Sequence, residues 1–391
     1  MTDRSVDVLV VGGGIHGVGV AQAAAAAGHS VLLLEARAVA AGTSSRSSKL
    51  IHGGLRYLES WQLRLVRESL AERELLLRLA PELVRLVPFH VPIYRSTRRR
   101  PWEIRAGLSL YALLGGLSAH ARFRKVPRAE WEDLDGLRLD GLQAVFCYHD
   151  GQTDDAALSR AVLRSALELG ATAEVGAELV EARLAGGRWS ARLRRGDAEE
   201  RADAAVLVNA AGPWANEVMA RLRPAPAPRA VDLVGGAHVE LAGELRRGIY
   251  YAEAPADGRA VFTMPWKGHT LVGTTETPYD GDPAAIEPTG EEIRYLEDTL
   301  HHYFPTHAGE RIAAWAGLRV LPRGTGRAFD RPREVMLHAD DPRAPRVLTI
   351  YGGKLTGYRS TAEKVLARLA PALPRRRAVA STRELRLTPV G

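Results

Sequence analysis

The feature that most constrains this chain is a glycine-rich turn between a short apolar run and an alanine-rich stretch. Residues 6–11 are apolar and predict a buried parallel strand. Residues 15–27 then predict a helix, and residues 30–34 predict a second strand. The segment therefore has the order of a βαβ unit, which places a parallel sheet at the start of the chain. The glycines of the turn have the spacing G-x-G-x-x-G and are Gly12, Gly14 and Gly17.

The spacing of these glycines suits the binding of a dinucleotide. Gly12 permits the tight turn, Gly14 lets the backbone approach a pyrophosphate, and Gly17 lets the helix pack against the strand. The helix N-terminus offers free N–H groups and the positive end of its dipole to the phosphates. Glu35, at the end of the second strand, can accept hydrogen bonds from ribose hydroxyls. The unit predicts a dinucleotide site without separating FAD from NAD.

Two later segments favour FAD. The apolar run 204–208 predicts a strand that ends in small residues, including Ala211 and Gly212, so a ligand could approach closely there. Gly352 and Gly353 come just before the predicted last helix, at 356–369, whose N-terminus could face a flavin ring. Contacts so far along the chain are expected for a long, extended flavin cofactor.

Composition limits the remaining classes. The chain has 391 residues, 46% of them hydrophobic, which is ample for a buried core. The single cysteine, Cys147, excludes an internal disulfide and fits a reducing compartment. The net charge of +7 comes almost entirely from arginine, because only five residues are lysine. One reading of this charge is that arginine is simply the usual cation at this protein's surface. The other is that the charge attracts anionic partners such as a phosphorylated substrate, a pyrophosphate or an acidic membrane.

Other patterns are missing from the sequence. We find no helix-turn-helix, zinc-finger or RNP-type pattern and therefore expect no nucleic-acid partner. We also find no metal-ligand spacing and expect no metal. Neither a secretory signal nor an apolar run of the ~20 residues that cross a bilayer is present, so we expect a cytoplasmic protein.

The order of the patterns predicts two domains that share one core. Pieces of the nucleotide-binding unit lie towards both ends, and residues 231–275 alternate like an antiparallel sheet. We expect an α/β protein with a Rossmann-like FAD-binding domain and an inserted, mainly antiparallel β substrate-binding domain. The expected boundaries are 1–80, 150–225 and 335–372 for the first domain, 81–149 and 226–334 for the second, and 373–391 for a tail.

One long run resembles a known family. Residues 42–59 look like the signature of the FAD-dependent glycerol-3-phosphate dehydrogenases, which belong to the D-amino-acid-oxidase-like flavoproteins. Glu276 stands where that family usually has aspartate. Members of the family usually carry a further helical C-terminal domain, which we expect to be missing here. Further matches occur in the family's order at 71–73, 210–215, 271–278, 317–321 and 351–356.

The resemblance implies a reaction. It is the FAD-dependent oxidation of sn-glycerol 3-phosphate to dihydroxyacetone phosphate, with hydride transfer from C2 to flavin N5 and electrons passed to quinone. Two alternatives are a glycerol-3-phosphate oxidase that uses oxygen and a flavin-binding subunit that needs a partner domain. A homodimer is a further expectation. The mildly apolar segment 101–125, flanked by arginines, is either a peripheral contact at the inner face of the cell membrane or a buried helix with a basic edge.

The implied reaction needs a phosphate clamp, a proton acceptor and a cation near the flavin. Arg56 and Arg319 match family positions that contact substrate, and the planar arginine fork suits phosphate. Tyr57 could add a hydroxyl, and Lys354 could stabilise the reduced flavin or touch the substrate. For the proton acceptor, histidine has the right pKa range, and we prefer His238.

The other candidate histidine, His52, is expected to lie against a non-covalently bound flavin. Lys49 could equally bind the flavin phosphates or have a structural role. The residues expected to bind the cofactor are Gly12, Gly14, Gly17, Glu35, Thr43, Ser44, Ser45, Ser48, Lys49, His52, Gly53, Ala211, Gly212, Gly353, Lys354, Leu355 and Thr356.

Overall fold

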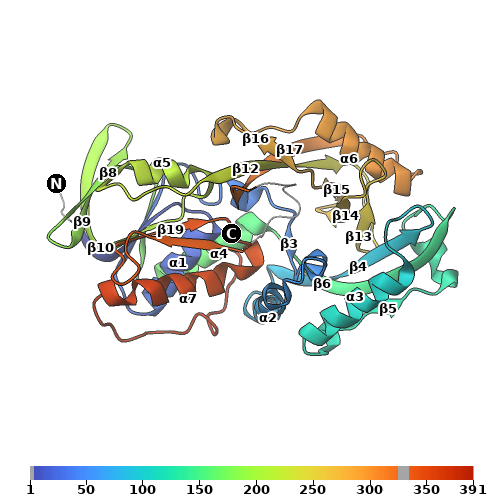
Figure 1. Ribbon diagram of the computed structural model, residues 1–391, viewed down its shortest axis with the longest axis horizontal. Coiled ribbons are helices and arrows are strands. Elements are labelled where there is room, and N and C mark those ends of the chain that lie inside the picture. The colour runs from blue at the N-terminus through green and yellow to red at the C-terminus, as the bar shows by residue number, and fades with distance from the viewer. Residues whose placement is uncertain (1–3, 325–333, 391) are drawn as a thin grey trace.

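The computed structural model describes residues 4–324 and 334–390. Two large sheets lie side by side along the long axis of the molecule, as Figure 1 shows. The first sheet carries the glycine-rich turn, and the second is built mainly from the middle of the chain. The expected α/β class with Rossmann-like and antiparallel parts is confirmed.

The first sheet has a parallel centre. Within the described residues its nine strands include the order β11-β8-β9-β10-β1-β2-β7, with β19 beside β10 and β18 beyond β19. The strands of this parallel centre are β1 (Arg4–Val11), β2 (Val31–Glu35), β7 (Thr172–Val175), β10 (Ala198–Asn209) and β19 (Val347–Tyr351). The others are β8 (Glu178–Ala185), β9 (Arg188–Arg195), β11 (Leu222–Arg223) and β18 (Met336–Ala339).

The central strands of this sheet are apolar and buried over residues 8–11 of β1 and 204–208 of β10, because both faces of the sheet are covered there. Val8 and Val10 face a helical layer, whereas Leu9 and Val11 belong to a second cluster that contains the buried Trp189 of β9. The helical layer consists of α1 (Ile15–Ala26), α4 (Asp155–Glu168) and α7 (Tyr358–Leu369), which lie together in Figure 1.

The second sheet is mainly antiparallel. Within the described residues its ten strands include the order β16-β12-β15-β14-β13-β4-β6-β3, with β17 paired to β12 and β5 to β6. The strands are β3 (Leu50–Ile51), β4 (Val84–Tyr94), β5 (Arg124–Lys125), β6 (Leu142–Thr153), β12 (Val231–Leu241), β13 (Ile249–Glu253), β14 (Ala260–Trp266), β15 (His269–Gly273), β16 (Thr277–Tyr279) and β17 (Arg311–Pro322).

Helices cover this sheet too. α6 (Gly290–Tyr303) packs Leu296 and Leu300 onto one cluster of the sheet, and α3 (Pro101–Leu114) packs Leu108 and Tyr111 onto another. The remaining helices are α2 (Leu63–Leu79) and α5 (Ala215–Ala220). No helix in the described part of the chain is long and apolar enough to cross a membrane.

The expected domain boundaries stay a proposal. Strands β4, β5 and β12 to β17 fall inside the two ranges proposed for the second domain, whereas β3 joins the second sheet from residues 50–51. β6 crosses the proposed boundary at 149/150 and runs to Thr153. The tail from residue 373 runs past the ends of α1 and α2: the Val379 and Ala380 N–H groups donate to Ala26 O, the N–H of Leu387 donates to Leu79 O, and Leu387 is buried.

Candidate active site

Three loops meet at the carboxyl edge of the first sheet. Gly12 follows β1, Ala210 follows β10 and Gly352 follows β19. These strands are parallel, so their carboxyl ends lie at the same edge. The Gly12 N–H donates to Leu34 O and the Ala210 N–H donates to Val11 O, both at 2.8 Å. The edge therefore brings together segments that are some 340 residues apart in sequence, from Gly12 to Gly352.

The first turn needs glycine at two of its positions. Gly12 has a φ of 111°, and a Cβ there would lie 2.6 Å from Ala210 O. A Cβ on Gly17 would lie 1.8 Å from Gly12 O. Helix α1 therefore rests directly on the turn and directs its free N–H end towards the space above the sheet.

Polar side chains order this turn. Glu35 accepts hydrogen bonds from Gly13 N–H at 2.7 Å through Oε2 and from Arg37 N–H at 2.8 Å through Oε1. At the start of α1, the Ile15 N–H donates to Ser44 Oγ at 2.9 Å. The loop after β2 is thereby fixed against the helix N-terminus.

A cavity of about 820 Å³ starts at this turn and extends to the second sheet. Its lining includes Gly12, Glu35, Ala211, Gly353, Arg319 and His238. Segments of both sheets therefore line one continuous cavity. We expect the cofactor at the end near the glycine turn and the substrate at the end near the second sheet.

The end of the cavity at the second sheet carries several charges. Lys354 Nζ lies 3.7 Å from the centre of the Tyr57 ring, and the Arg56 guanidinium lies 5.1 Å from the same ring. Burial opposes the charge of Arg56, but Tyr57 and Glu276 nearby outweigh it and raise its pKa. The cations and Tyr57 thus form one group around an aromatic face.

Arg319 lies on β17 and is held by the segment after β15. Its guanidinium donates to Thr275 O at 3.2 Å and to Thr274 Oγ1 at 3.1 Å, and Nη1 lies 3.7 Å from Glu276 Oε1. The Arg319 side chain keeps 25% of its surface exposed, whereas Glu276 keeps 6%. Arg319 is therefore fixed in place and still accessible to a ligand. Glu276, at the position where the family usually has aspartate, supplies part of this support.

His238 lies on β12 beside the arginine. Its ring stacks on Trp315 with centroids 5.9 Å apart, and Nε2 lies 3.0 Å from Ser48 Oγ. Burial, together with the nearby charges of Arg319 and Lys49, lowers the pKa of His238 to about 3. The ring is therefore neutral near pH 7, which is the state that can accept a proton.

Two other histidines line the cavity. His52 lies in the loop after β3 with its ring edge towards Phe262, and burial lowers its pKa to about 3 with help from Lys354 and Arg56. His16 lies in the first turn of α1, against Gly353, and burial lowers its pKa to about 4. Both rings are neutral near pH 7 and add polar surface without charge.

Most residues that the sequence assigns to the site line this cavity. Among the described residues, four of them do not contribute to its lining: Gly17, Ser45, Lys49 and Gly53. Gly17 packs on Gly12, Gly53 N–H donates to Tyr111 Oη at 2.8 Å, and Lys49 Nζ donates to Ser45 O and Asp155. These contacts of Lys49 are with protein groups, and the cofactor assignments of all four residues stay predictions.

Sequence reasoning missed other residues of the lining. His16 occupies a variable position of the glycine motif, so the spacing gives no reason to single it out. Trp214 lies under the Arg37 guanidinium at 4.5 Å, and Tyr251 and Phe262 come from β13 and β14. The segment 210–215 that contains Trp214 could have been found from its match to the family run. The two strand aromatics carry no such signal.

The residues present fit FAD. The glycine turn leaves room that a Cβ at Gly12 would fill, the helix N-terminus suits a pyrophosphate, and Glu35 stands at the end of β2. In the described part of the chain no group of three or more histidine, cysteine or acidic side chains could hold a metal. A dinucleotide turn that opens into a cavity with cations and a neutral histidine defines an FAD-dependent oxidoreductase.

Comparisons with known proteins narrow this class. The family described as "DAO: FAD dependent oxidoreductase" matches residues 7–361. A glycerol-3-phosphate dehydrogenase of Pseudomonas aeruginosa is 39% identical over 380 residues, which cover 93% of this chain and 72% of that protein. The chain therefore belongs to the glycerol-3-phosphate dehydrogenase family of FAD-dependent oxidoreductases. The predicted family and the predicted FAD cofactor are confirmed.

Two further relatives bear on the substrate and the fold. A D-erythritol 1-phosphate dehydrogenase of Brucella abortus is 36% identical over 380 residues, covering 94% of this chain and 74% of that protein. A solved glycerol-3-phosphate dehydrogenase of Bacillus halodurans, complexed with FAD, superposes with a TM-score of 0.74 at 27% identity and covers 99% of this chain and 68% of that one. The family thus contains dehydrogenases of more than one polyol phosphate.

Proposed function

We propose that this protein oxidises sn-glycerol 3-phosphate to dihydroxyacetone phosphate with FAD as its cofactor. The observation that carries the proposal is the group of cations at the second-sheet end of the cavity. Arg56, Arg319 and Lys354 bring three positive charges there, and Glu276 brings a negative one. A phosphate dianion suits such a group, because the guanidinium forks can hold two of its oxygens.

His238 is the proposed proton acceptor. Oxidation of the C2 alcohol removes the hydroxyl proton and a hydride from carbon. The neutral His238 takes the hydroxyl proton, and the nearby positive charge of Arg319 stabilises the alkoxide character that develops on that oxygen. When bound, FAD supplies the acceptor for the hydride.

The chain's own residues also hold the cofactor. The N-terminus of α1 and the Gly12 turn would hold the pyrophosphate, and Glu35 would accept from the ribose. His52, His16 and the loop from Gly353 to Thr356 line the same cavity. In the proposed binding mode the reacting alcohol would lie next to the flavin and away from the adenine end.

Steady-state kinetics with a dye acceptor test the proposed substrate. We expect a kcat/KM for sn-glycerol 3-phosphate at least ~100-fold above that for glycerol, because charge-assisted hydrogen bonds to phosphate contribute about 1.5–3 kcal/mol each. D-erythritol 1-phosphate is the informative comparison, since a relative of equal similarity is named for it. Equal kcat/KM for glycerol and its phosphate would contradict the proposal. A higher kcat/KM for D-erythritol 1-phosphate would support the proposed phosphate clamp but would contradict sn-glycerol 3-phosphate as the substrate.

We propose that quinone is the electron acceptor and that the protein binds at the inner face of the cell membrane to reach it. α3 exposes Trp102 by 71% and Leu113 by 60%, and Leu117 just beyond it is 61% exposed. Exposed basic residues flank this helix at Arg98, Arg100, Arg122, Arg124 and Lys125. An apolar helix face with a basic border suits an anionic membrane surface.

Vesicle binding tests this contact. Protein should co-sediment with anionic vesicles at low salt and not with neutral ones, and Trp102→Ala should weaken that binding several-fold while dye-linked activity is unchanged. Leu139→Ala, an exposed residue elsewhere, is the matched control. Protein that ignores anionic vesicles would remove the membrane proposal. Peroxide formed in proportion to substrate consumed, with no reduction of a soluble quinone, would instead favour the oxidase.

We also propose that FAD is held without a covalent bond. His52 lines the cavity, but its ring packs edge-on towards Phe262 at a centroid distance of 6.4 Å. Protein denatured in acid and precipitated should therefore leave all of its yellow colour in the supernatant. Colour that stays with the precipitate would show a covalent link, and His52→Ala would then identify the residue.

A further inference from the structure

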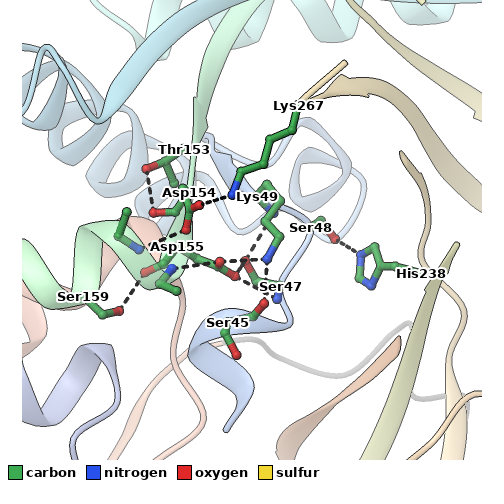
Figure 2. Close-up of polar contacts among 12 residues, drawn as sticks. Ser45, Ser47, Ser48, Lys49, Thr153, Asp154, Asp155, Ser159, His238 and Lys267 are labelled. Atoms are coloured by element: carbon green, nitrogen blue, oxygen red, sulfur yellow. Dashed lines mark hydrogen bonds and ion pairs between the residues drawn. The ribbon is translucent and has the colours of Figure 1, made fainter. Parts of the chain in front are cut away.

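A contact between Ser48 and His238 joins the two halves of the molecule. Ser48 lies in the loop between β2 and β3, and His238 lies on β12 of the second sheet. Their Oγ and Nε2 atoms are 3.0 Å apart, and Figure 2 shows the Ser48 side chain directed at the imidazole. We propose that Ser48 is a positioning residue for His238, and that the buried Lys49–Asp155 ion pair fixes the loop that carries Ser48. The proposal rests on the proposed role of His238 as proton acceptor.

The ion pair is well placed to fix this loop. Lys49 is 5% exposed, and its Nζ donates to Asp155 Oδ1 at 2.8 Å and to Ser45 O at 2.6 Å. Asp155 is fully buried, and its Oδ2 accepts from Ser47 N–H at 3.0 Å and Ser47 Oγ at 2.6 Å. The residues on both sides of Ser48 are therefore tied to one carboxylate at the start of α4 (Figure 2).

Lys49 holds an uncommon backbone conformation. Its φ is 60°, in the left-handed region that costs a non-glycine residue about 1–2 kcal/mol. Such a conformation persists when its surroundings over-determine it, and here the ion pair and the hydrogen bond from Thr153 N–H to Lys49 O at 2.9 Å do so. As a result the Lys49 side chain lies against α4 while the preceding Ser48 side chain faces β12.

The His238 ring is bounded on its other sides. Trp315 stacks on it at an interplanar angle of 15°. Gly273 lies opposite it on β15, where a Cβ would come within 2.2 Å of the ring. Van der Waals contacts thus set the ring plane, and two polar neighbours act on the ring: the Ser48 hydroxyl at Nε2, and the Gly236 backbone, whose hydrogen bond partly opposes the lowering of the His238 pKa. The Ser48 hydroxyl can either donate to Nε2 or accept from it, so the contact fixes the orientation of the His238 ring in either tautomer.

The charges around His238 come from two elements. Arg319 on β17 and Lys49 in the loop both lower the pKa of the imidazole, in addition to burial. Lys49 therefore acts on His238 by its charge as well as through Ser48. This makes the pH dependence of activity a useful readout, because a merely structural residue would leave it unchanged.

The test uses the FAD-loaded enzyme with Ser48→Ala and Ser48→Thr. Loss of the hydrogen bond should lower kcat per bound flavin about 10-fold with little change in KM, since a hydrogen bond contributes about 0.5–1.5 kcal/mol. Thr keeps the hydroxyl and should restore kcat to within about threefold. Ser159→Ala is the matched control, because its Oγ donates to Asp155 O at 2.8 Å in the same cluster without contacting His238.

Two outcomes would overturn the proposal. One is a Ser48→Ala enzyme with unchanged kcat per flavin and an unchanged pH profile. The other is a loss of FAD with unchanged activity of the flavin that remains, which would make Ser48 a cofactor ligand only.

Lys49→Met should raise the pKa of His238 and move the acid limb of kcat/KM to higher pH. Its effect on kcat should add only in part to that of Ser48→Ala, because Lys49 acts on His238 partly through the Ser48 contact and partly by its charge.

A second readout separates this inference from the proposed function. Ring signals of isotope-labelled histidine report tautomer and pKa directly, and the His238 signal is the one lost in His238→Gln. Ser48→Ala should change that signal, and Ser159→Ala should not. If wild-type protein fails to oxidise sn-glycerol 3-phosphate but this change is seen, the proposed function fails and the Ser48–His238 contact stands. An unchanged His238 signal in Ser48→Ala would overturn the contact itself.

Discussion

The two ends of the cavity are built in different ways. The cofactor end uses backbone: glycines, a helix N-terminus and N–H groups ordered by Glu35, all within one βαβ unit. The substrate end uses side chains from separate segments, with Arg56 after β3, His238 on β12 and Arg319 on β17. The first end depends on close approach of main chain, and the second depends on charge and proton affinity. Substitutions should therefore remove the cofactor at one end and only the chemistry at the other.

The largest effect is expected at the cofactor end. Gly17→Ala puts a Cβ 1.8 Å from Gly12 O, so α1 must move off the turn and FAD binding should weaken at least ~100-fold. Gly107→Ala is the matched control, because it is also a helical glycine but has no atom within 4 Å of its Cβ position. That control should be neutral or more stable by up to about 1 kcal/mol. FAD content of the purified proteins measures both, and a Gly17→Ala enzyme with full FAD would break the comparison.

At the substrate end, His238→Gln should retain FAD and lose turnover. A positioned general base contributes about 10²–10⁴-fold, so kcat should fall in that range. Glutamine keeps polar atoms near Ser48 but cannot take up the proton. Dye-linked kinetics on enzyme of measured flavin content gives the result. A kcat within threefold of wild type would assign proton acceptance to another group, with His52 as the next candidate.

A smaller effect is expected for Arg319→Lys. The point charge remains, but the planar fork that suits phosphate is lost, together with the hydrogen bonds to Thr274 and Thr275. We expect kcat/KM for sn-glycerol 3-phosphate to fall about 10–100-fold, since charge-assisted hydrogen bonds contribute about 1.5–3 kcal/mol. Turnover of glycerol should fall far less. An equal fall for both alcohols would place Arg319 outside the phosphate site.

The smallest expected effect is on the pH dependence of stability, and it involves histidines at both ends of the cavity. Burial lowers the pKa values of His16, His52 and His238 to about 4, 3 and 3, whereas unfolded histidine titrates near 6.5. Between those values the unfolded chain binds more protons, so stability falls as pH falls from about 6.5 towards 4. Each histidine contributes a slope of at most about 1.4 kcal/mol per pH unit. Denaturant unfolding of apoprotein from pH 7 to pH 5 measures it.

A variant makes this last prediction specific. His16→Asn should unfold with a shallower dependence on pH, because one of the proton-binding groups is gone. The interval above pH 5 is chosen because carboxylates with lowered pKa values, such as Asp154 and Glu292, lose their stabilising contribution only at lower pH. Identical slopes for wild type and variant would show that His16 is not neutral in the fold.

The same contrast explains how much the sequence could predict. The glycine turn could be predicted because the strand, the turn and the helix that form it all lie within residues 6–35 and follow a regular spacing. β4 was missed because Pro88 and Pro92 interrupt its run, and prolines argue against a central strand. The structure accommodates them: β13 pairs with β4 only at Phe89 and His90, which lie between the two prolines.

The sequence does not predict a second strand, β6, because its polar residues are buried. β6 ends in polar positions that favour a loop, yet Asp150 and Gln152 are both buried. Arg73 Nη1 lies 2.6 Å from Asp150 Oδ1, and Gln152 donates to Pro265 O at 2.9 Å. These partners come from distant segments of the chain, so no local sequence pattern predicts the contacts. For the same reason the sequence could single out Ser48 and Lys49 as site residues but could not show which groups each one contacts.

The most direct test of the central claim is anaerobic mixing of the FAD-loaded protein with sn-glycerol 3-phosphate. The flavin's visible absorbance should bleach within one turnover, and His238→Gln should bleach ~10²–10⁴-fold more slowly with the same flavin content. Glycerol at the same concentration should bleach far more slowly than its phosphate. Flavin that stays oxidised in wild-type protein, while FAD remains bound, would contradict the account.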